Sequence, residues 1–167
     1  MEGMIDAVLS LLREDVAKEP IEQVDIMAIV ETIAADATDG GMTVVIDGPH
    51  HMVVAGRHLA LKRAMTNLVQ NALKYGCQAS LHASQVGDRV VISIEDEGPG
   101  IPPNQLEAVF EPFYRGEPSR ARSTGGHGLG LTVARMILRS HGGDVTLANR
   151  NPKGLQARVT LPAAPTV

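Results

Sequence analysis

Val90-Val-Ile-Ser-Ile-Glu-Asp-Glu-Gly-Pro-Gly-Ile101 is the stretch of sequence that decides the fold. Its first six residues place branched apolar side chains at every second position, a pattern typical of a strand with one buried face. The strand leads into Asp96, after which Gly98-Pro-Gly100 requires a sharp turn and permits close approach of the backbone. We therefore predict a strand that ends in a carboxylate beside a glycine turn.

The Asp96 carboxylate has two possible roles. As a ligand anchor in an otherwise apolar pocket, it would accept a hydrogen bond from a donor such as an exocyclic amine. As an ordinary turn residue, it would only cap its own backbone. This stretch alone favours the capping role, and the remaining segments of the chain change that balance.

The composition is that of an ordinary globular protein. The 167 residues suffice for one compact domain with an appendage, and 44% of them are apolar while 20% are charged. A net charge of −4 does not point to nucleic acid or to an anionic membrane. No apolar run reaches the roughly 18 residues that a membrane span needs. The single cysteine, Cys77, excludes an internal disulfide and fits a reducing compartment.

The spacing of apolar residues predicts four helices and a series of strands. The expected helices are 2–18, 25–38, 57–75 and a segment from the glycine-rich run at 125–130 to about residue 140. The expected strands are 43–47 and 51–55, joined by Gly48-Pro49, then 78–84, the stretch that begins at residue 90, 145–148 and 155–161. The last four strands would form two hairpins.

The first expected helix carries an apolar stripe that is long for so short a segment. The stripe consists of Met4, Ile5, Val8, Leu11 and Leu12, and Pro20 ends the helix. Such a stripe needs a partner surface. Two alternatives remain open: the rest of this domain, or the other half of a helical hairpin that lies outside the chain.

The helix expected at 57–75 has two distinct faces. The buried stripe consists of Leu61, Met65, Leu68 and Ala72, and the polar face of Asn67, Asn71, Lys74 and Tyr75. Asparagine inside a helix costs stability relative to alanine, and such a conflict is most expected at a working site. An amide oxygen suits a magnesium ion that phosphates and water already partly coordinate, and the lysine and tyrosine would then reach phosphate oxygens. The alternative is a solvated polar face.

A second glycine-rich run, Gly125-Gly-His-Gly-Leu-Gly130, opens the last helix. Free N–H groups and the positive dipole end at such a helix start favour phosphate. The run is not a Walker loop, since no Gly-Lys-Ser/Thr occurs, and it lacks the preceding strand of a dinucleotide fingerprint. The segment 117–124 before it is polar and contains Arg120 and Arg122, which favours a mobile lid over an anionic ligand rather than an ordinary surface loop.

Taken together, these segments resemble the catalytic ATP-binding domain of a sensor histidine kinase, a member of the GHKL ATPase superfamily. The resemblance covers roughly residues 22–162 and rests on four motifs in the family's order. They are the N box, Asn67-Leu-Val-Gln-Asn-Ala-Leu-Lys-Tyr75, the first glycine box, Asp96-Glu-Gly-Pro-Gly-Ile101, the F box, Phe110-Glu-Pro-Phe113, and the second glycine box, Gly126-His-Gly-Leu-Gly-Leu131.

The resemblance implies ATP and Mg²⁺ as cofactors and assigns their contacts residue by residue. Asp96 would accept the adenine amino group, with the base lined by Gly98, Gly100 and Ile101. Asn71 would hold the Mg²⁺ ion with support from Asn67, and the phosphates or ribose would be contacted by Lys74 and Tyr75. From the lid side, the phosphates would be contacted by Gly126, His127, Gly128, Leu129 and Gly130, with His127 at a position where many relatives have Ser or Thr.

The same resemblance implies the fold and the domain organisation. We expect a two-layer α/β sandwich, with a mixed, mostly antiparallel sheet of about five strands packed on three helices. Residues 21–167 would form the catalytic ATP-binding domain, and residues 1–20 the C-terminal end of a dimerisation and phosphoacceptor hairpin or a linker. The chain would then be a fragment of a bacterial, homodimeric kinase, cytoplasmic or the cytoplasmic portion of an inner-membrane sensor, whose further partner is a response regulator.

Two features decide the expected activity. The ATPase branches of the superfamily carry a glutamate general base four residues before the magnesium asparagine, whereas this chain has Asn67, which takes up no proton. Transfer to a histidine needs no such base, because a neutral imidazole is already a nucleophile. The family's acceptor histidine is typically followed by Glu or Asp, and none of the six histidines here is. We therefore expect an acceptor outside this chain and no catalytic residue beyond the nucleotide site. A GHKL-type ATPase and an interaction module without catalysis are the alternatives.

Overall fold

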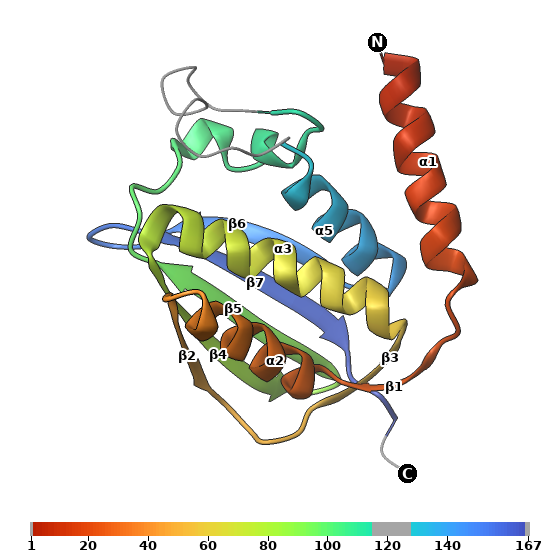
Figure 1. The fold of residues 1–167 in the computed structure, drawn as a ribbon, viewed down its shortest axis with the longest axis horizontal. Coiled ribbons are helices and arrows are strands. Elements are labelled where there is room, and N and C mark those ends of the chain that lie inside the picture. Colours follow the sequence, from red (N-terminus) through yellow and green to blue (C-terminus); the bar gives the residue numbers. More distant parts are fainter. Residues whose placement is uncertain (1, 115–127, 166–167) are drawn as a thin grey trace.

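A five-stranded sheet forms the centre of the molecule. The computed structural model describes residues 2–114 and 128–165. The strands lie in the order β2-β4-β5-β7-β6 (Figure 1). Their bounds are Thr43–Asp47 for β2, Gln78–Val86 for β4, Arg89–Asp96 for β5, Asp144–Asn149 for β6 and Leu155–Pro162 for β7. The pair β2 and β4 is parallel and the other neighbouring pairs are antiparallel, which confirms the expected mixed sheet.

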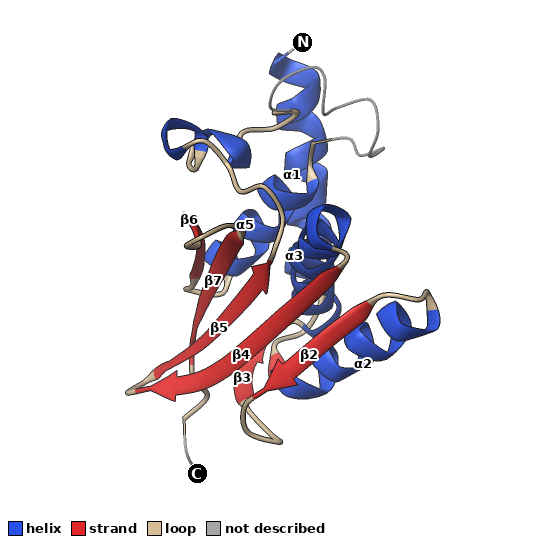
Figure 2. Cartoon of the chain, turned by 90° about the vertical axis from the view of Figure 1, so that its left-hand side faces the viewer, coloured by secondary structure: helices blue, strands red, loops and turns tan. Residues whose placement is uncertain are grey.

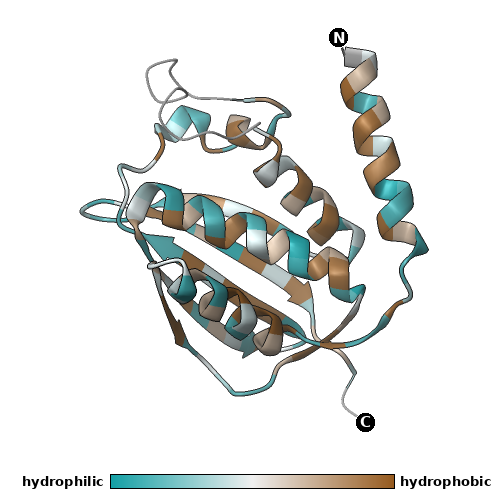
Figure 3. Ribbon diagram, in the orientation of Figure 1, coloured by the Kyte–Doolittle hydropathy of each residue, from teal (hydrophilic) through white to brown (hydrophobic). Residues whose placement is uncertain are grey.

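Helices cover one face of this sheet. The covering helices are α2 (Ile26–Asp39), α3 (His58–Gly76) and α5 (Gly130–Ser140), and Figure 2 shows them on the same side of the strands. Two short 3-10 helices, η1 (Pro103–Gln105) and η2 (Ala108–Phe110), follow the turn after β5. In Figure 3 the covering helices carry both apolar and polar faces, as a layer between a sheet and solvent requires. The expected two-layer sandwich is confirmed for the described residues.

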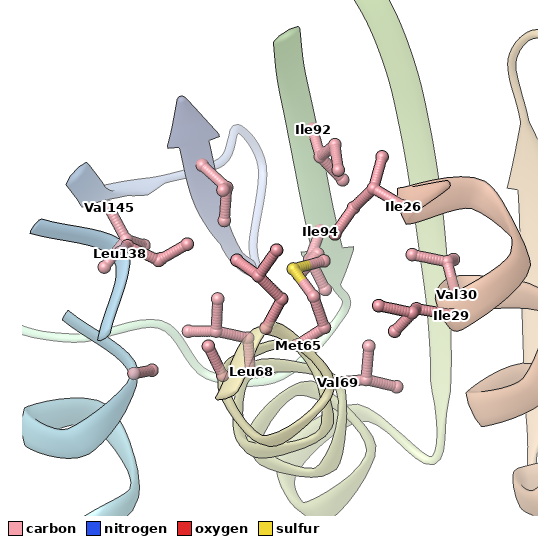
Figure 4. Packing of buried hydrophobic residues seen from close by; sticks show 14 of the residues in the cluster. Ile26, Ile29, Val30, Met65, Leu68, Val69, Ile92, Ile94, Leu138 and Val145 are labelled. Carbon is pink, nitrogen blue, oxygen red and sulfur yellow. The ribbon is translucent and has the colours of Figure 1, made fainter. Parts of the chain in front are cut away.

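The core lies between the sheet and these helices. The α3 stripe is buried as predicted, and it consists of Leu61, Met65, Leu68 and Ala72. Figure 4 shows Met65 and Leu68 facing Ile94 of β5, with Ile29 of α2 and Leu138 of α5 to either side. Each fully buried side chain of this kind contributes about 1.5–3 kcal/mol. Because α3 is packed from three directions, its position relative to the end of β5 is fixed.

A second, two-stranded sheet lies near the start of α2, and it was not predicted. β1 (Glu22–Asp25) pairs antiparallel with β3 (Val53–Gly56). The strands expected at 43–47 and 51–55 therefore exist close to those positions but belong to different sheets. Asp25 explains the separation, because its Oδ1 accepts hydrogen bonds from Met27 N at 3.1 Å and from Met52 N at 3.0 Å. The chain that leaves β2 is thereby held at the start of α2.

α1 (Glu2–Lys18) packs against α5 and stands apart from the sheet (Figure 1). Leu12 and Val16 pack against the core, whereas Met4, Val8 and Leu11 on another face are exposed, Met4 by 73%. One part of the apolar stripe thus has this domain as its partner, and another part is uncovered. Among the described helices, none is long and apolar enough to cross a lipid bilayer.

Hydrogen bonds of His141 connect the start of α3 to the end of α5. His141 follows α5, with its Nδ1 2.7 Å from the carbonyl oxygen of Ile137 and its Nε2 accepting a hydrogen bond from Arg57 N at 3.0 Å. Together these contacts require a neutral ring with the proton on Nδ1. Gly56 permits the approach, because a Cβ there would lie 2.8 Å from Cδ2 of the His141 ring.

Candidate functional site

Asp96 is the last residue of β5 and lies against the end of α3. It is only 4% exposed, and it is the one buried charged residue within the described part of the chain. A Cβ at Gly76, the last residue of α3, would lie 2.9 Å from the Asp96 Cβ, so the helix end and the strand end are in contact. The predicted strand with a terminal carboxylate is therefore present, and the packing of α3 positions that carboxylate.

The two oxygens of the Asp96 carboxylate have different surroundings. Oδ1 accepts hydrogen bonds from Gly98 N at 2.8 Å and from Leu155 N at 3.3 Å. Within the described residues these are the hydrogen bonds of the carboxylate, so Oδ2 keeps its acceptor capacity for a ligand. The two roles considered for this residue are compatible, because one oxygen caps the turn while the other is free to act as an anchor.

Burial raises the pKa of Asp96 above the ordinary value of an aspartate, although the hydrogen bonds from Gly98 and Leu155 and the charge of Arg150 act in the opposite direction. The ionised form is therefore less favourable in the folded protein than in the unfolded chain. An acceptor whose charge costs stability is more expected at a ligand site than at a purely structural turn.

Gly98 and Gly100 allow the turn after Asp96 to close tightly. A Cβ at Gly98 would lie 3.0 Å from both Tyr75 O and Asp96 Oδ1. Gly100 has a φ of +73°, and a Cβ there would lie 2.6 Å from Asn149 Oδ1. At both positions a side chain would displace a neighbour, which explains why the turn needs glycine.

Asn149, at the end of β6, holds this turn in place, and sequence reasoning missed it. Its Nδ2 donates to Ile101 O at 2.6 Å, and its Oδ1 accepts from Ile101 N at 2.8 Å. Two bonds to one residue fix both the position and the orientation of the backbone there. The polar residues after the strand expected at 145–148 marked a turn, but nothing local indicated a contact across 48 residues.

The turn between β6 and β7 also packs on the backbone of Asp96. Arg150 Nη1 donates to Asp96 O at 2.8 Å, and Arg150 Nη2 lies 3.2 Å from Glu95 Oε2. Gly154 has a φ of +111°, and a Cβ there would lie 2.1 Å from Asp96 O. Asp96 is thus held on its side chain by Leu155 and on its main chain by Arg150, at the same hairpin turn.

The polar face of α3 leads from the middle of the helix to the end beside Asp96. Asn67 and Asn71 are half-buried, and Lys74 and Tyr75 are exposed. Lys74 Nζ lies 5.5 Å from the centre of the Tyr75 ring. The expected separation of this face from the buried stripe is confirmed, and the amides are the less exposed part of it.

Asn67 connects this face to the start of α5. Its Nδ2 donates to the carbonyl oxygen of Gly130, the first residue of α5, at 3.2 Å. Just before it, Leu129 occupies the N-cap position, and the Gly128 carbonyl oxygen accepts a hydrogen bond from Phe113 N at 3.0 Å. The N box and the described part of the second glycine box therefore lie side by side.

Gly126 and His127, which we expect to contact the phosphates, lie outside the described residues. The expected lid at 117–124 lies outside them as well. The F box on the other side of that gap is attached to α5. Thr132 Oγ1 donates to Phe110 O at 2.7 Å, and the Arg135 guanidinium lies 4.3 Å from the centre of the Phe110 ring. Both ends of the segment that contains the expected lid are therefore supported by one helix.

The arrangement brings together a buried acceptor, a polar helix face and a helix start. Asp96 can accept a hydrogen bond from an amine, the two amides offer neutral oxygen ligands, and the start of α5 offers N–H groups to an anion. This order fits a molecule with an amine-bearing base at one end and phosphates at the other. Within the described residues, no group of three or more His, Cys, Asp or Glu side chains is placed to hold a metal ion.

A known family matches the part of the chain that contains this site. The sequence model of the family described as "Histidine kinase-, DNA gyrase B-, and HSP90-like ATPase" matches residues 56–165. That range includes α3, the turn after β5, α5 and the hairpin of β6 and β7, which are the elements that contribute side chains or backbone to the site.

Curated relatives are similar over nearly the whole chain. The sensor histidine kinase GtrS of Pseudomonas aeruginosa is 37% identical over 162 residues, which cover 97% of this chain and 33% of the relative. The sensor protein RstB of Escherichia coli is 36% identical over 156 residues, which cover 87% of this chain and 35% of the relative. The chain thus spans about a third of the length of these relatives.

Solved structures share the fold. The mycobacterial sensor histidine kinase MprB superposes with a TM-score of 0.77 at 25% identity, covering 88% of this chain and all of that one. The ATP-binding domain of PrrB from Mycobacterium tuberculosis superposes with a TM-score of 0.71 at 26% identity, covering 87% of this chain and 98% of that one.

We predict that Asp96→Asn is at least as stable as the wild type at pH 7. Burial raises the folded-state pKa of Asp96, so its charge opposes folding above that pKa, and the neutral amide removes this cost. The advantage of the variant should shrink as the pH falls and the wild-type carboxyl becomes protonated. Thermal unfolding of both proteins between about pH 3 and about pH 8, a range that includes the pKa of about 3.9 of a free aspartate, measures the difference. A large loss of stability at pH 7 would contradict this account.

We predict that Asn149→Ala loosens the glycine turn without unfolding the domain. Loss of both hydrogen bonds exposes the Ile101 amide, whose hydrogen exchange should accelerate by about tenfold, as the loss of about 1.4 kcal/mol of local stability would produce. Exchange measured by NMR reports the change at this amide. Thr146→Ala, an exposed substitution on the same strand, is the matched control and should leave the Ile101 rate unchanged. An unaltered rate in Asn149→Ala would show that the turn holds its shape without this side chain.

Proposed function

We propose that this chain, which belongs to the family of histidine kinase-, DNA gyrase B- and HSP90-like ATPases, is the catalytic ATP-binding domain of a bacterial sensor histidine kinase. Membership of the family implies that the chain binds ATP. In the proposed reaction, the γ-phosphate passes from ATP to a histidine outside this chain and then to an aspartate of a response regulator.

One observation carries the proposal: a buried carboxylate keeps one acceptor oxygen free at the closed end of the site. Oδ1 of Asp96 is occupied by backbone N–H groups, so Oδ2 is left to accept the adenine amino group. A hydrogen bond in such a dry site is strong, and leaving it unmade is costly, which favours bases that carry an amine. Gly98, Gly100 and Ile101 would line the base, because they belong to the turn that directly follows Asp96.

The phosphates would lie along the polar face of α3 toward the start of α5. Asn71 would supply one oxygen ligand to Mg²⁺, which neutralises phosphate charge when bound. Asn67, tied to Gly130, would support that position, and Lys74 and Tyr75 would contact the phosphates or ribose from the exposed end of the helix. The second glycine box would supply backbone contacts from the lid side through Gly126, His127, Gly128, Leu129 and Gly130.

The site contains an amide where an ATPase would need a base. The side chain of Asn67 donates to Gly130 O and takes up no proton, so it does not activate water. Transfer to an imidazole needs positioning and charge stabilisation instead, which the proposed contacts provide. This difference favours a histidine kinase over an ATPase among the members of the family.

The proposed reaction also needs segments that lie elsewhere in the full-length protein. Because the chain spans about a third of its sensor-kinase relatives, the acceptor histidine and the sensing region would lie in the rest of the protein. We assign residues 21–167 to the catalytic domain and residues 1–20 to the end of the dimerisation and phosphoacceptor hairpin or to a linker. A homodimer that works with a response regulator in the bacterial cytoplasm, alone or beneath an inner-membrane sensor, follows from the same proposal.

We predict that the chain binds ATP in a saturable manner and more tightly with magnesium. Asp96→Asn should weaken binding by at least tenfold, because a hydrogen bond to a charged acceptor is worth about 1.5–3 kcal/mol and about 1.4 kcal/mol corresponds to tenfold. Asn71→Ala should remove most of the magnesium dependence. Isothermal titration with and without magnesium measures both effects.

The control for charge is Asp88→Asn, which removes an exposed aspartate at the opposite end of β5 and should bind like the wild type. Absence of ATP binding by a folded wild-type chain would overturn the proposal. That result would favour an interaction module without catalysis.

We predict that this chain does not hydrolyse ATP steadily on its own but phosphorylates a histidine in the full-length kinase. Radiolabelled ATP, followed by acid and base treatment of the product, distinguishes an acid-labile phosphohistidine from free phosphate. Asn71→Ala in the full-length protein should abolish labelling. Steady phosphate release by the isolated chain, lost in Asn71→Ala, would instead identify an ATPase.

A further inference from the structure

Glu19, which follows α1, caps the helix that carries the N box. Its Oε1 accepts a hydrogen bond from Leu59 N at 2.5 Å, and its Oε2 accepts one from Ala60 N at 3.1 Å. Both donors are in the first turn of α3, where backbone N–H groups have no partner within the helix. One carboxylate thus occupies two of these positions at once, from a residue 40 positions earlier in the chain.

The start of α3 depends on this remote carboxylate because it has no capping side chain of its own. Arg57 stands at the N-cap position and makes no side-chain cap. An acidic group at this end of a helix also meets the positive end of the helix dipole. Arg57 returns a contact, since its Nε donates to the carbonyl oxygen of Glu19 at 3.0 Å. The backbone and the side chain of Glu19 are therefore both fixed to the start of α3.

Arg57 also connects the start of α3 to the end of α5. The backbone N–H of Arg57 donates to Nε2 of His141, and Nδ1 of His141 contacts the Ile137 carbonyl oxygen in the last turn of α5. Gly56 has no room for a side chain beside that ring. Glu19 thus contacts α3 directly and is linked to α5 through Arg57 and His141.

The contact of α1 with α5, by comparison, is loosely packed. Val16 rests on the core, but a pocket of about 170 Å³ remains between the end of α1, Arg57 and α5. The pocket is lined by Arg13, Val16, Ala17, Arg57, Met136, Ile137 and Ser140. The polar contacts of Glu19 therefore define the position of the segment after α1 more strictly than the apolar contact does.

We propose that Glu19 is a positioning residue through which α1 and the nucleotide site influence each other. The contact holds the start of α3, and the same helix carries Asn67 and Asn71 farther along. A displacement of α1 that withdraws Glu19 leaves Leu59 N and Ala60 N without their partner and releases one end of the α3 and α5 pair. This inference rests on the proposed ATP binding and adds a residue that acts on it from a distance.

Coupling of this kind is reciprocal. If the hydrogen bonds of Glu19 to the start of α3 raise the affinity for MgATP by some factor, bound MgATP must stabilise these hydrogen bonds by the same factor. A residue that serves stability alone would lower the melting temperature without changing the affinity, and bound nucleotide would not alter its contacts. Reciprocity therefore separates a positioning role from a structural one.

The experiment compares the wild type, Glu19→Ala and Glu19→Gln, with Glu22→Gln as the matched control. Glu22 is a nearby exposed acidic residue, and its substitution tests the effect of charge alone. Isothermal titration with MgATP gives the affinity of each protein, and thermal unfolding gives its stability. NMR hydrogen exchange at the Leu59 and Ala60 amides, with and without MgATP, reports the capping contact.

We expect Glu19→Ala to bind MgATP about fivefold or more weakly, the lower range of measured allosteric couplings, and Glu22→Gln to bind like the wild type. MgATP should slow exchange at Leu59 and Ala60 in the wild type but not in Glu19→Ala. If Glu19→Ala does not fold, Glu19→Gln decides, since it keeps one acceptor oxygen and should show a smaller loss of affinity.

An unchanged affinity in a folded Glu19 variant, or exchange at these amides that MgATP does not alter, would overturn the inference while leaving ATP binding intact. Absence of MgATP binding by the wild type would instead remove the proposed function on which the inference rests. The two failures are thereby distinguishable.

Discussion

The candidate site depends on one buried carboxylate, that of Asp96, whose Oδ1 is hydrogen-bonded to the protein backbone. A buried charge is costly unless hydrogen bonds surround it, and among the described residues the partners of Asp96, Gly98 and Leu155, both bind Oδ1. Arg150 binds the main chain of the same residue and fixes the strand end without occupying the second oxygen. In our proposal the acceptor capacity of Oδ2 selects a ligand with an amine, and this one oxygen is then the source of specificity.

α3 serves both the core and the site, and this double role explains the precision of the arrangement. Its buried stripe is packed from the sheet and from two helices, while its polar face lies between the buried carboxylate and the start of α5. Its C-terminal end touches Asp96 at Gly76, and its N-terminal end is capped by Glu19. In our proposal, residues far from the ligand therefore affect binding without contacting it.

Local patterns predicted the parts of the molecule that depend on periodicity. Alternation before Asp96 correctly indicated β5, and the stripe that contains Met65 correctly indicated α3, because packing on one face imposes a repeat on the sequence. Contacts between distant segments leave no such repeat, so Asn149 with Ile101 and Glu19 with Leu59, 48 and 40 residues apart, were missed. β1 was missed for another reason, since four residues are too few to show alternation.

The hydrogen bond from Leu155 to Asp96 has a consequence for biosynthesis. The two residues are 59 positions apart, and between them the chain must complete α5 and β6. During translation the N-terminal half of the sheet can assemble first, but the carboxylate obtains its second backbone partner only after β7 has left the ribosome. Until Leu155 has emerged this bond cannot form, and water takes its place at Oδ1, so the surroundings of Asp96 are complete only when nearly the whole chain has been synthesised.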